Sequence, residues 1–438
     1  MSQQDEIKNS YLGSDMPNSF DCYERAEAAL AGPSTFSKGP GQFAYGITPF
    51  SLDHGQGPLV WDVDGHSYID YILGLGSNIL GYGDGAFLAS VQAQLVKGIA
   101  FSLTTGLEIE VAELLREYIP CAELVRFGKN GSDVTSAAVR LARYVTGRDV
   151  ILFCGYHGWQ NWYAAKTSMS GGIPECEKAN SVRFAFNDLP ALEEQFALHH
   201  GQVACVIMEA IYKVDPGAEY LRAVKKLCAK NGCLLIFDEV ITGFRCPSGS
   251  VQKMHGVTPD LACFSKALGN GFPVSALVGR REIMRSCEKI YFTLTNAGEA
   301  VSLAAARHVL QRYLAEDCPG RISAVGARLY EGVQKILAES NVAFAEVQGF
   351  AWRNVLAFRG QGEVEANVYR TLWMQETARR GVLNGGYHFL SLAHDEQTVA
   401  RTLSIYKEVF DLLAGVSSME DARQLLKCPL SALAARDV

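Results

Sequence analysis

Two short apolar runs of this chain each end in a residue that can do chemistry. Residues 233–237 precede Asp238, and residues 261–265 precede Lys266. Short apolar runs bounded by turn residues are typical of buried parallel strands. Parallel strands deliver their last residues to the carboxyl edge of a sheet, where the ligands of α/β folds bind. The sequence therefore predicts an acid and an amine at one edge of one sheet.

The chemistry of this pair depends on the surroundings of the lysine. Burial among apolar neighbours disfavours the charged form of a lysine, which lowers its pKa and makes the amine a nucleophile. Lys266 has such neighbours, and Gly269 and Gly271 after it let backbone pass close to a ligand. A nucleophilic lysine forms a Schiff base with an aldehyde, and an acid such as Asp238 can hold the proton of a pyridinium ring. The pair points to a site for pyridoxal 5'-phosphate (PLP).

Neither residue is decisive by itself. Asp238 could cap a loop, and Lys266 could end a strand at the solvent. Asp238 and Glu239 after an apolar strand also resemble the Mg²⁺-holding strand of P-loop ATPases. That class requires the motif G-x-x-x-x-G-K-[ST], and the nearest segment, 128–131, does not match it. An ATPase is therefore disfavoured.

A candidate phosphate site lies at 130–133, before an amphipathic helix that we predict from near Ser132 to Gly147. Gly131 and Ser132 offer N–H groups, a hydroxyl donor and the positive end of a helix dipole, which together suit a phosphate. An ordinary serine N-cap is the commoner explanation of the same residues.

An aromatic residue follows another predicted strand, 150–153. Tyr156 could stack on a planar heterocycle, although core packing explains it equally well. His157 beside it has no serine or cysteine nucleophile near it in sequence, so we assign it a structural or ring-contact role rather than that of a general base.

Strand and helix patterns alternate from residue 59 onward, which favours a mostly parallel sheet with helices on both faces. The predicted strands are 59–65, 150–153, 203–208, 234–238, 261–265 and 276–278, and the crossover and closing helices are 220–230 and 300–314. The later pattern is α+β, with helices at 322–340, 365–380 and 396–413 and strands within 343–358 and at 389–392. We predict an N-terminal arm rich in Gly, Pro and Ser (1–60), a large domain (61–318) and a small α+β domain (319–438).

Composition sets the class of protein. The 438 residues are 48% hydrophobic and 20% charged, as in globular proteins, and the net charge of −7 gives no sign of a nucleic-acid partner. The twelve cysteines are scattered without a CxxC pair, which favours core thiols in a reducing compartment over a metal site. We see neither a signal peptide nor an apolar run of about 18 residues for a membrane helix, and we predict a cytoplasmic protein.

Taken in order, the motifs resemble class III (ω-type) aminotransferases of PLP fold type I, and most of all the group around glutamate-1-semialdehyde 2,1-aminomutase. The resemblance runs from about residue 31 to 413 and implies a large domain with a mostly parallel seven-stranded sheet between helices and a smaller C-terminal α+β domain. Its markers are 61–65, 68–70, 130–133, 156–158, Glu209, 238–240, 242–245, Lys266, 271–274, Thr295 and 298–299.

The resemblance implies a role for each residue around the ring of PLP. Lys266 forms the Schiff base and then carries the proton between Cα and C4′. Asp238 pairs with the pyridine nitrogen and keeps it protonated, because opposite charges favour each other's charged forms. Tyr156 and Val240 pack on the two ring faces, and Glu209 lies near the polar edge of the ring.

The same resemblance assigns the phosphate and the assembly. Gly131 and Ser132 hold the phosphate of PLP, and Thr295 reaches the phosphate of the neighbouring subunit. The active unit should therefore be a symmetric homodimer. Its partners are a small-molecule amine donor and a carbonyl acceptor, without nucleic acid or membrane.

The chain departs from the family at several positions. Asp133 stands where the family usually has Glu, and Ala210 where it often has Pro. The segment 295–300 ends in Gly-Glu-Ala, with Glu299 and Ala300 in place of the commoner Asn and Pro. These are changes in loops, and we expect the chemistry to be intact.

The substrate side departs further from the aminomutase. The N-terminal arm of the aminomutase carries an arginine for the substrate carboxylate. Residues 34–39 of this chain offer only Lys38, a less specific partner for a carboxylate. The loop 384–388 also looks shorter. Lys38, Arg245 and Arg353 are our candidates for substrate contacts.

These observations predict a PLP-dependent transaminase that moves an amino group between an amine donor and a carbonyl acceptor through a Schiff base on Lys266. An intramolecular aminomutase is the second choice. A PLP-fold binding module with vestigial chemistry is an alternative of another class, against which the retained Lys266 and Asp238 argue, because an unused buried charge pair is costly.

Overall fold

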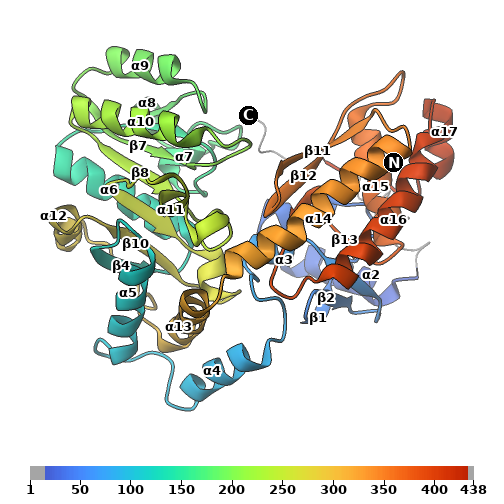
Figure 1. The fold of residues 1–438 in the computed structure, drawn as a ribbon, viewed down its shortest axis with the longest axis horizontal. Helices are drawn as coiled ribbons and strands as arrows, with labels where there is room; N and C mark the ends of the chain where they lie inside the picture. The colour runs from blue at the N-terminus through green and yellow to red at the C-terminus, as the bar shows by residue number, and fades with distance from the viewer. Residues whose placement is uncertain (1–14, 433–438) are drawn as a thin grey trace. The chain divides into compact units, whose positions relative to one another are not determined.

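The computed structural model of the protein describes residues 15–432, which fall into two compact units. The large unit is Gly85–Gly320, and the second unit combines the described residues up to Asp84 with those from Arg321 onward (Figure 1). Residues 61–84, which we predicted in the large domain, cluster with the second unit. The reason is that β3 (Ser67–Asp70) pairs in parallel with β13 (Val382–Leu383).

The large unit is built on a sheet whose strand order, within the described residues, is β4-β10-β9-β8-β7-β5-β6. All neighbouring strands run parallel except β10, which is antiparallel to both β4 and β9. This confirms the predicted mostly parallel seven-stranded sheet. The strands are β4 (Leu124–Gly128), β5 (Val150–Cys154), β6 (Ser181–Arg183), β7 (Val203–Met208), β8 (Leu234–Asp238), β9 (Leu261–Phe264) and β10 (Ser275–Gly279).

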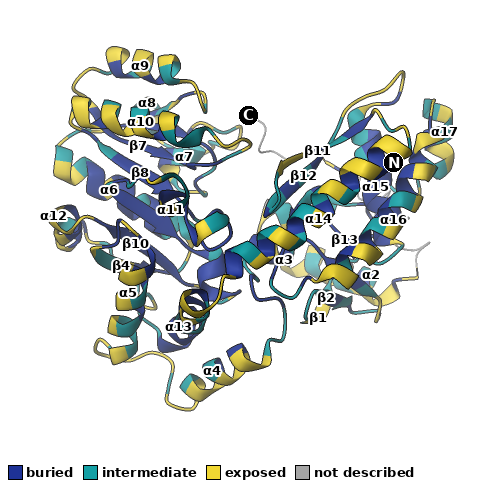
Figure 2. Cartoon of the chain, in the orientation of Figure 1, coloured by how far each residue is buried: buried dark blue, intermediate teal, exposed yellow. Residues whose placement is uncertain are grey.

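Helices cover this sheet. Every residue of β5, β7, β9 and β10 is buried, as expected for strands covered on both faces (Figure 2). The helices and 3₁₀ turns of the large unit are α4 (Gly85–Leu95), α5 (Gly106–Tyr118), α6 (Gly131–Thr146), α7 (Asn161–Ala164), α8 (Glu175–Asn180), α9 (Leu189–Leu198), α10 (Gly217–Asn231), η3 (Pro247–Gly249), α11 (Val251–His255), η4 (Lys266–Gly269), α12 (Arg281–Met284), η5 (Arg285–Lys289) and α13 (Ala300–Ala315).

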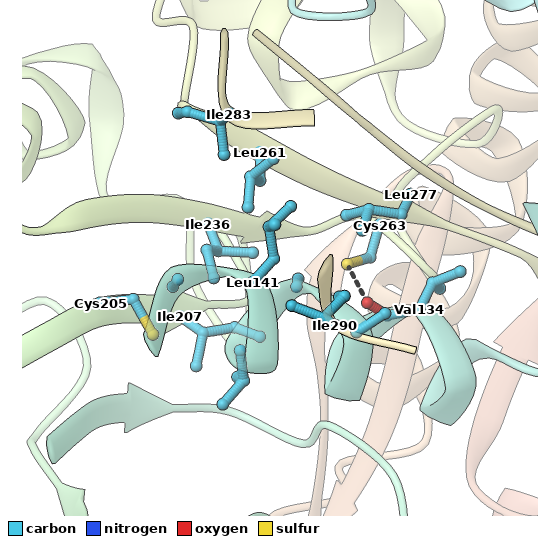
Figure 3. Packing of buried hydrophobic residues seen from close by; sticks show 14 of the residues in the cluster. Val134, Leu141, Cys205, Ile207, Ile236, Leu261, Cys263, Leu277, Ile283 and Ile290 are labelled. Atoms are coloured by element: carbon cyan, nitrogen blue, oxygen red, sulfur yellow. Dashed lines mark hydrogen bonds between the residues drawn. The ribbon is translucent and has the colours of Figure 1, made fainter. Parts of the chain in front are cut away.

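The helix α6 forms the centre of the packing that positions the site. Its buried face, which includes Val134 and Leu141, packs on apolar residues of the strands, such as Ile236 (Figure 3). The thiol of Cys263 donates a hydrogen bond to the carbonyl of Val134 at 3.4 Å. The helix ends at Gly147 in the left-handed conformation (φ 65°), as the sequence predicted.

The second unit contains two small sheets. One has the order β1-β2-β3-β13 and the other β11-β12-β14. Its elements are α2 (Pro17–Ala29), η1 (Phe36–Lys38), η2 (Pro40–Gln42), β1 (Leu52–Gln56), β2 (Leu59–Asp62), β3, α3 (Leu73–Gly76), most of α14 (Cys318–Glu339), β11 (Ala345–Phe350), β12 (Arg353–Phe358), α15 (Ala366–Ala378), β13, β14 (Tyr387–Phe389), α16 (Glu396–Ala414) and α17 (Met419–Leu425).

None of the helices among residues 15–432 is long and apolar enough to cross a membrane. No group of three or more His, Cys, Asp or Glu side chains in that range is arranged to hold a metal ion.

Candidate functional site

The polar residues of the site gather at the carboxyl edge of the large sheet. Asp238 ends β8, and Cys263 of β9 lies beside it in register. Lys266 follows three residues later, at the start of η4. Glu209 follows β7, and Tyr156 follows β5, so four neighbouring parallel strands end in these four residues.

The turn that carries Lys266 is strained. Its φ is 46°, in the left-handed region that residues with a Cβ avoid. Such strain costs on the order of 1–3 kcal/mol and clusters at functional sites, where the surrounding structure holds it in place. Here the hydroxyl of Ser265 donates to the carbonyl of Val274 (2.9 Å), and the backbone N–H of Leu268 donates to the carbonyl of Ser265 (3.1 Å).

Asp238 is buried and held from two sides. Its Oδ1 accepts the backbone N–H of Val240 at 3.0 Å, and its Oδ2 lies 2.8 Å from Nδ1 of His157. The Nε2 of His157 lies 2.9 Å from the carbonyl oxygen of Cys154. A carbonyl only accepts, so Nε2 carries a proton and donates it. The contact between Nδ1 and Oδ2 then needs a second proton between them.

The surroundings of His157 hold its ring in place. The imidazole is 2% exposed and stacks on the indole of Trp162, with the ring centroids 5.6 Å apart and 28° between planes. The ring therefore meets the buried carboxylate of Asp238 in a fixed orientation.

The predicted phosphate cradle is the amino end of α6. Gly131 and Ser132 lie in its first turn, where backbone N–H groups have no partner inside the helix. The carboxylate of Asp133 turns back and accepts the N–H groups of Lys129 (3.1 Å) and Asn130 (2.7 Å). The negative charge of Asp133 therefore binds the backbone of its own loop.

Two glycines let the segments of the site approach one another. A Cβ on Gly158 would lie 2.1 Å from Oγ of Ser132, and a Cβ on Gly131 would lie 3.0 Å from Cγ1 of Val240. The cradle therefore lies against both the turn after Tyr156 and the segment after Asp238.

Glu209 fixes the backbone of the residue predicted to stack on the ring. The N–H of Tyr156 donates to Oε2 of Glu209 at 2.9 Å, and a Cβ on Gly155 would lie 2.8 Å from the same oxygen. Glu209 is 3% exposed, whereas Tyr156 is half-buried. A cavity of about 300 Å³ opens at this edge, with Gly155, Arg183 and Tyr212 in its wall.

Four predicted residues come from other segments of the chain. Thr295 is exposed in a turn before α13. Lys38 is exposed and Arg353 half-buried, both in the second unit, and Nε and Nη1 of Arg353 have no hydrogen-bond partner among residues 15–432. Arg245 is fully buried in the large unit, where Nη1 donates to the carbonyl of Ile241 (3.2 Å), so it is closed to a substrate.

Sequence reasoning missed the bond between His157 and Asp238. It assigned His157 a structural or ring-contact role without naming a partner. The signal was present, since both residues follow predicted strands whose carboxyl ends share one edge.

The residues present fit PLP. The site offers a cradle of glycine, hydroxyl and helix N–H groups for a phosphate, a buried acid for a pyridinium and a lysine at the adjacent strand end. These are the features of a PLP-dependent enzyme of fold type I.

The comparisons with known proteins agree. The family model of class III aminotransferases matches residues 43–393, and the chain belongs to this family, whose cofactor is PLP. The chain is 33% identical over 407 residues to a 3-aminobutyryl-CoA aminotransferase of Cloacimonas acidaminovorans, covering 90% of this chain and 96% of that protein. It is 34% identical over 391 residues to a glutamate-1-semialdehyde 2,1-aminomutase of Methanothermobacter thermautotrophicus, covering 82% and 92%.

A solved structure shows the same fold. The PLP internal aldimine form of the FumI protein of Sphingopyxis sp. MTA144 superposes with a TM-score of 0.85 at 28% identity, covering 92% of this chain and 97% of that one. The protein is thus a PLP-dependent enzyme of the class III aminotransferases.

Proposed function

We propose that this enzyme is a transaminase in which Lys266 forms the Schiff base with PLP and moves the proton during transfer. The observation that carries the proposal is the meeting of Lys266, Asp238 and the amino end of α6 at one sheet edge. When bound, PLP supplies an aldehyde for the amine and an electron sink for the bond that breaks.

The other residues bind and orient. Gly131 and Ser132 hold the phosphate, Tyr156 and Val240 flank the ring, and Glu209 lies near its polar edge. Support comes from the close approach of Gly131 to Val240 and from the bond that holds Tyr156 to Glu209. Asp238, held by His157 and by the N–H of Val240, pairs with the pyridine nitrogen.

We also propose a homodimer in which Thr295 reaches the phosphate of the partner's PLP. The large unit exposes Val96 (87%), Leu103 (85%) and Tyr291 (85%), and large apolar side chains with this exposure suit an interface. The carbonyl of Ile99 accepts the N–H of Ala300 at 2.7 Å, which holds the loop of Val96 and Leu103 against the start of α13. The mass of the holoenzyme in solution checks this assembly.

The substrates are small molecules, an amine donor and a carbonyl acceptor. Of the three candidates for substrate contacts, Lys38 and Arg353 stay proposals, whereas Arg245 is occupied in the core. The relatives support a donor panel that includes 3-aminobutyryl-CoA, and an intramolecular aminomutase is the second candidate, with glutamate 1-semialdehyde as its substrate. The twelve free thiols support a reducing compartment, for which we propose the cytoplasm.

The test is Lys266→Ala beside Lys230→Ala, a change of an exposed lysine at the end of α10. Wild type and Lys230→Ala should fix PLP on borohydride reduction and transfer amino groups from at least one donor. Lys266→Ala should do neither, while still binding PLP without a covalent bond. Wild-type turnover by Lys266→Ala would refute the assignment, and PLP binding without any transfer by wild type would favour the vestigial module.

A further inference from the structure

The ammonium group of Lys129 joins three loops around the cofactor site. Lys129 lies between β4 and α6, directly before the phosphate cradle. Its Nζ donates to Oε1 of Glu299 at 2.7 Å and to the carbonyl of Pro273 at 3.0 Å. Pro273 lies in the segment that leads from Lys266 to β10, and Glu299 lies at the start of α13.

The ion pair is largely withdrawn from water. The side chains of Lys129 and Glu299 are 15% and 11% exposed. Burial raises the pKa of Glu299, but hydrogen bonds from Lys129 and Ser302 outweigh burial and lower this pKa below its usual value. A sheltered pair of this kind depends on both partners, since either charge left alone would be poorly solvated.

Glu299 also shapes the segment that carries Thr295. It is the N-cap of α13, where its carboxylate accepts the N–H groups of Val301 (2.8 Å) and Ser302 (3.1 Å). Its own N–H donates to the carbonyl of Asn296 at 3.2 Å, which closes the turn directly after Thr295. The side chain that caps the helix is therefore the one that holds Lys129.

We propose that Lys129 and Glu299 are positioning residues that hold the phosphate cradle against the Thr295 turn and thereby set how tightly PLP is retained. This inference rests on the proposed function, because it takes Gly131 and Ser132 as the phosphate site of one subunit and Thr295 as a phosphate ligand of the other. In a dimer, the pair then links the cofactor of each subunit to that of its partner.

The test measures the dissociation constant of PLP for the apoenzymes of wild type, Lys129→Met, Glu299→Gln and the double variant. Each single change should weaken PLP binding about tenfold, the size expected for a charge-assisted hydrogen bond. The double variant should bind PLP at most about threefold more weakly than either single variant, because the two residues act as one unit. Lys129→Arg, which keeps the charge, should restore most of the affinity.

Two controls separate positioning from general stability. Arg307→Met removes an ion pair of the same helix α13, with Glu110 at 3.2 Å, and should leave the PLP affinity unchanged. The turnover number of Arg307→Met at saturating PLP should likewise stay within about twofold of wild type, because the reacting groups are untouched. Thr295→Ala should weaken PLP binding less in Lys129→Met than in wild type, since the turn is already released.

Wild-type PLP affinity in Lys129→Met would overturn the inference, and so would a double variant whose loss equals the product of the single losses. An equal effect of Thr295→Ala in both backgrounds would overturn the link to that turn. Failure of the wild type to form any borohydride-reducible adduct with PLP would instead overturn the proposed function.

Discussion

His157→Phe should remove the side chain that contacts the carboxylate of Asp238. The phenyl ring can keep the stacking on Trp162, whose centroid lies 5.6 Å from that of the imidazole, but it cannot donate to Oδ2 of Asp238 or to the carbonyl of Cys154. Asp238 is 3% exposed, so water cannot replace the lost donor. The N–H of Val240, on the other oxygen, is unaffected and still stabilises the carboxylate.

The size of the effect follows from this geometry. A hydrogen bond to a charged group contributes about 1.5–3 kcal/mol, and leaving a buried charge without its partner costs about 3–5 kcal/mol. We take the smaller figure as the expected loss, because Asp238 keeps its contact with Val240 and becomes only a weaker partner for the pyridine nitrogen. A loss of about 1.5–3 kcal/mol in the transition state lowers the turnover number by roughly ten- to a hundredfold.

The assay combines kinetics with a direct view of the cofactor. Turnover number and KM for the amine donor should be measured with saturating PLP, and the nitrogen resonance of ¹⁵N-labelled PLP should report protonation of the ring. We expect the turnover number to fall with little change in KM and the resonance to move toward the unprotonated position. His157→Gln, which keeps a neutral donor, should lie between wild type and His157→Phe.

Thr135→Val is the matched control, because its hydroxyl binds the backbone carbonyl of His157 at 3.0 Å and not the ring. It should disturb the same loop without moving the nitrogen resonance. A protonated pyridine nitrogen and a wild-type turnover number in His157→Phe would refute the reasoning, since Asp238 would then need no partner.

Two further predictions use other parts of the chain. Gly158→Ala should weaken PLP binding at least about tenfold, because the new Cβ would lie 2.1 Å from Oγ of Ser132 and the φ of +108° disfavours side chains. The control is Gly171→Ala, whose new Cβ would have nothing within 4 Å. This control should bind PLP like wild type in equilibrium dialysis. In the second unit, burial lowers the pKa of His388 to about 3 and that of His394 to about 4, from 6.5. The unfolded chain then binds more protons below pH 6.5, so stability is complete above that value and falls as the pH falls, by about 2 kcal/mol per histidine at pH 5. Denaturant unfolding at a series of pH values should show this slope, and His388→Gln should roughly halve it; an unchanged slope would contradict the assignment.

In the large sheet, the sequence predicted the strands that are almost wholly buried and missed β4 and β6. The runs that became β5, β7 and β9 are apolar throughout, and β8 is apolar up to its last residue, Asp238, which is the signature of strands covered on both faces. β6 has only three residues, and β4 has an exposed residue at Arg126, so neither gives that signature.

The direction of β10 was within reach of the sequence. The connection from β9 to β10 spans residues 265–274 and contains only the short η4. A parallel return needs a crossover of about a dozen residues or more, usually with a helix, so a connection this short favours an antiparallel strand. Local pattern identified the strand, and the length of the loop should have set its direction.

The candidate site could be predicted where it depends on strand order and not where it depends on a hydrogen-bond acceptor. Asp238 and Lys266 end adjacent strands, so their meeting follows from two apolar runs. The state of His157 depends instead on the carbonyl of Cys154, a backbone group that no side-chain motif reveals.

That carbonyl has consequences for the whole site. It accepts from Nε2 of His157 and so leaves Nδ1 to face a carboxylate that also only accepts, which makes a second proton necessary between them. Cys154 is the last residue of β5, and the turn that follows also places the N–H of Tyr156 on Glu209. One strand end therefore orients Tyr156, which we propose to stack on the ring, and through His157 also orients Asp238, which we propose to pair with the pyridine nitrogen. The proposed cofactor contacts thus depend on backbone that lies two strands away from Asp238 in the sheet.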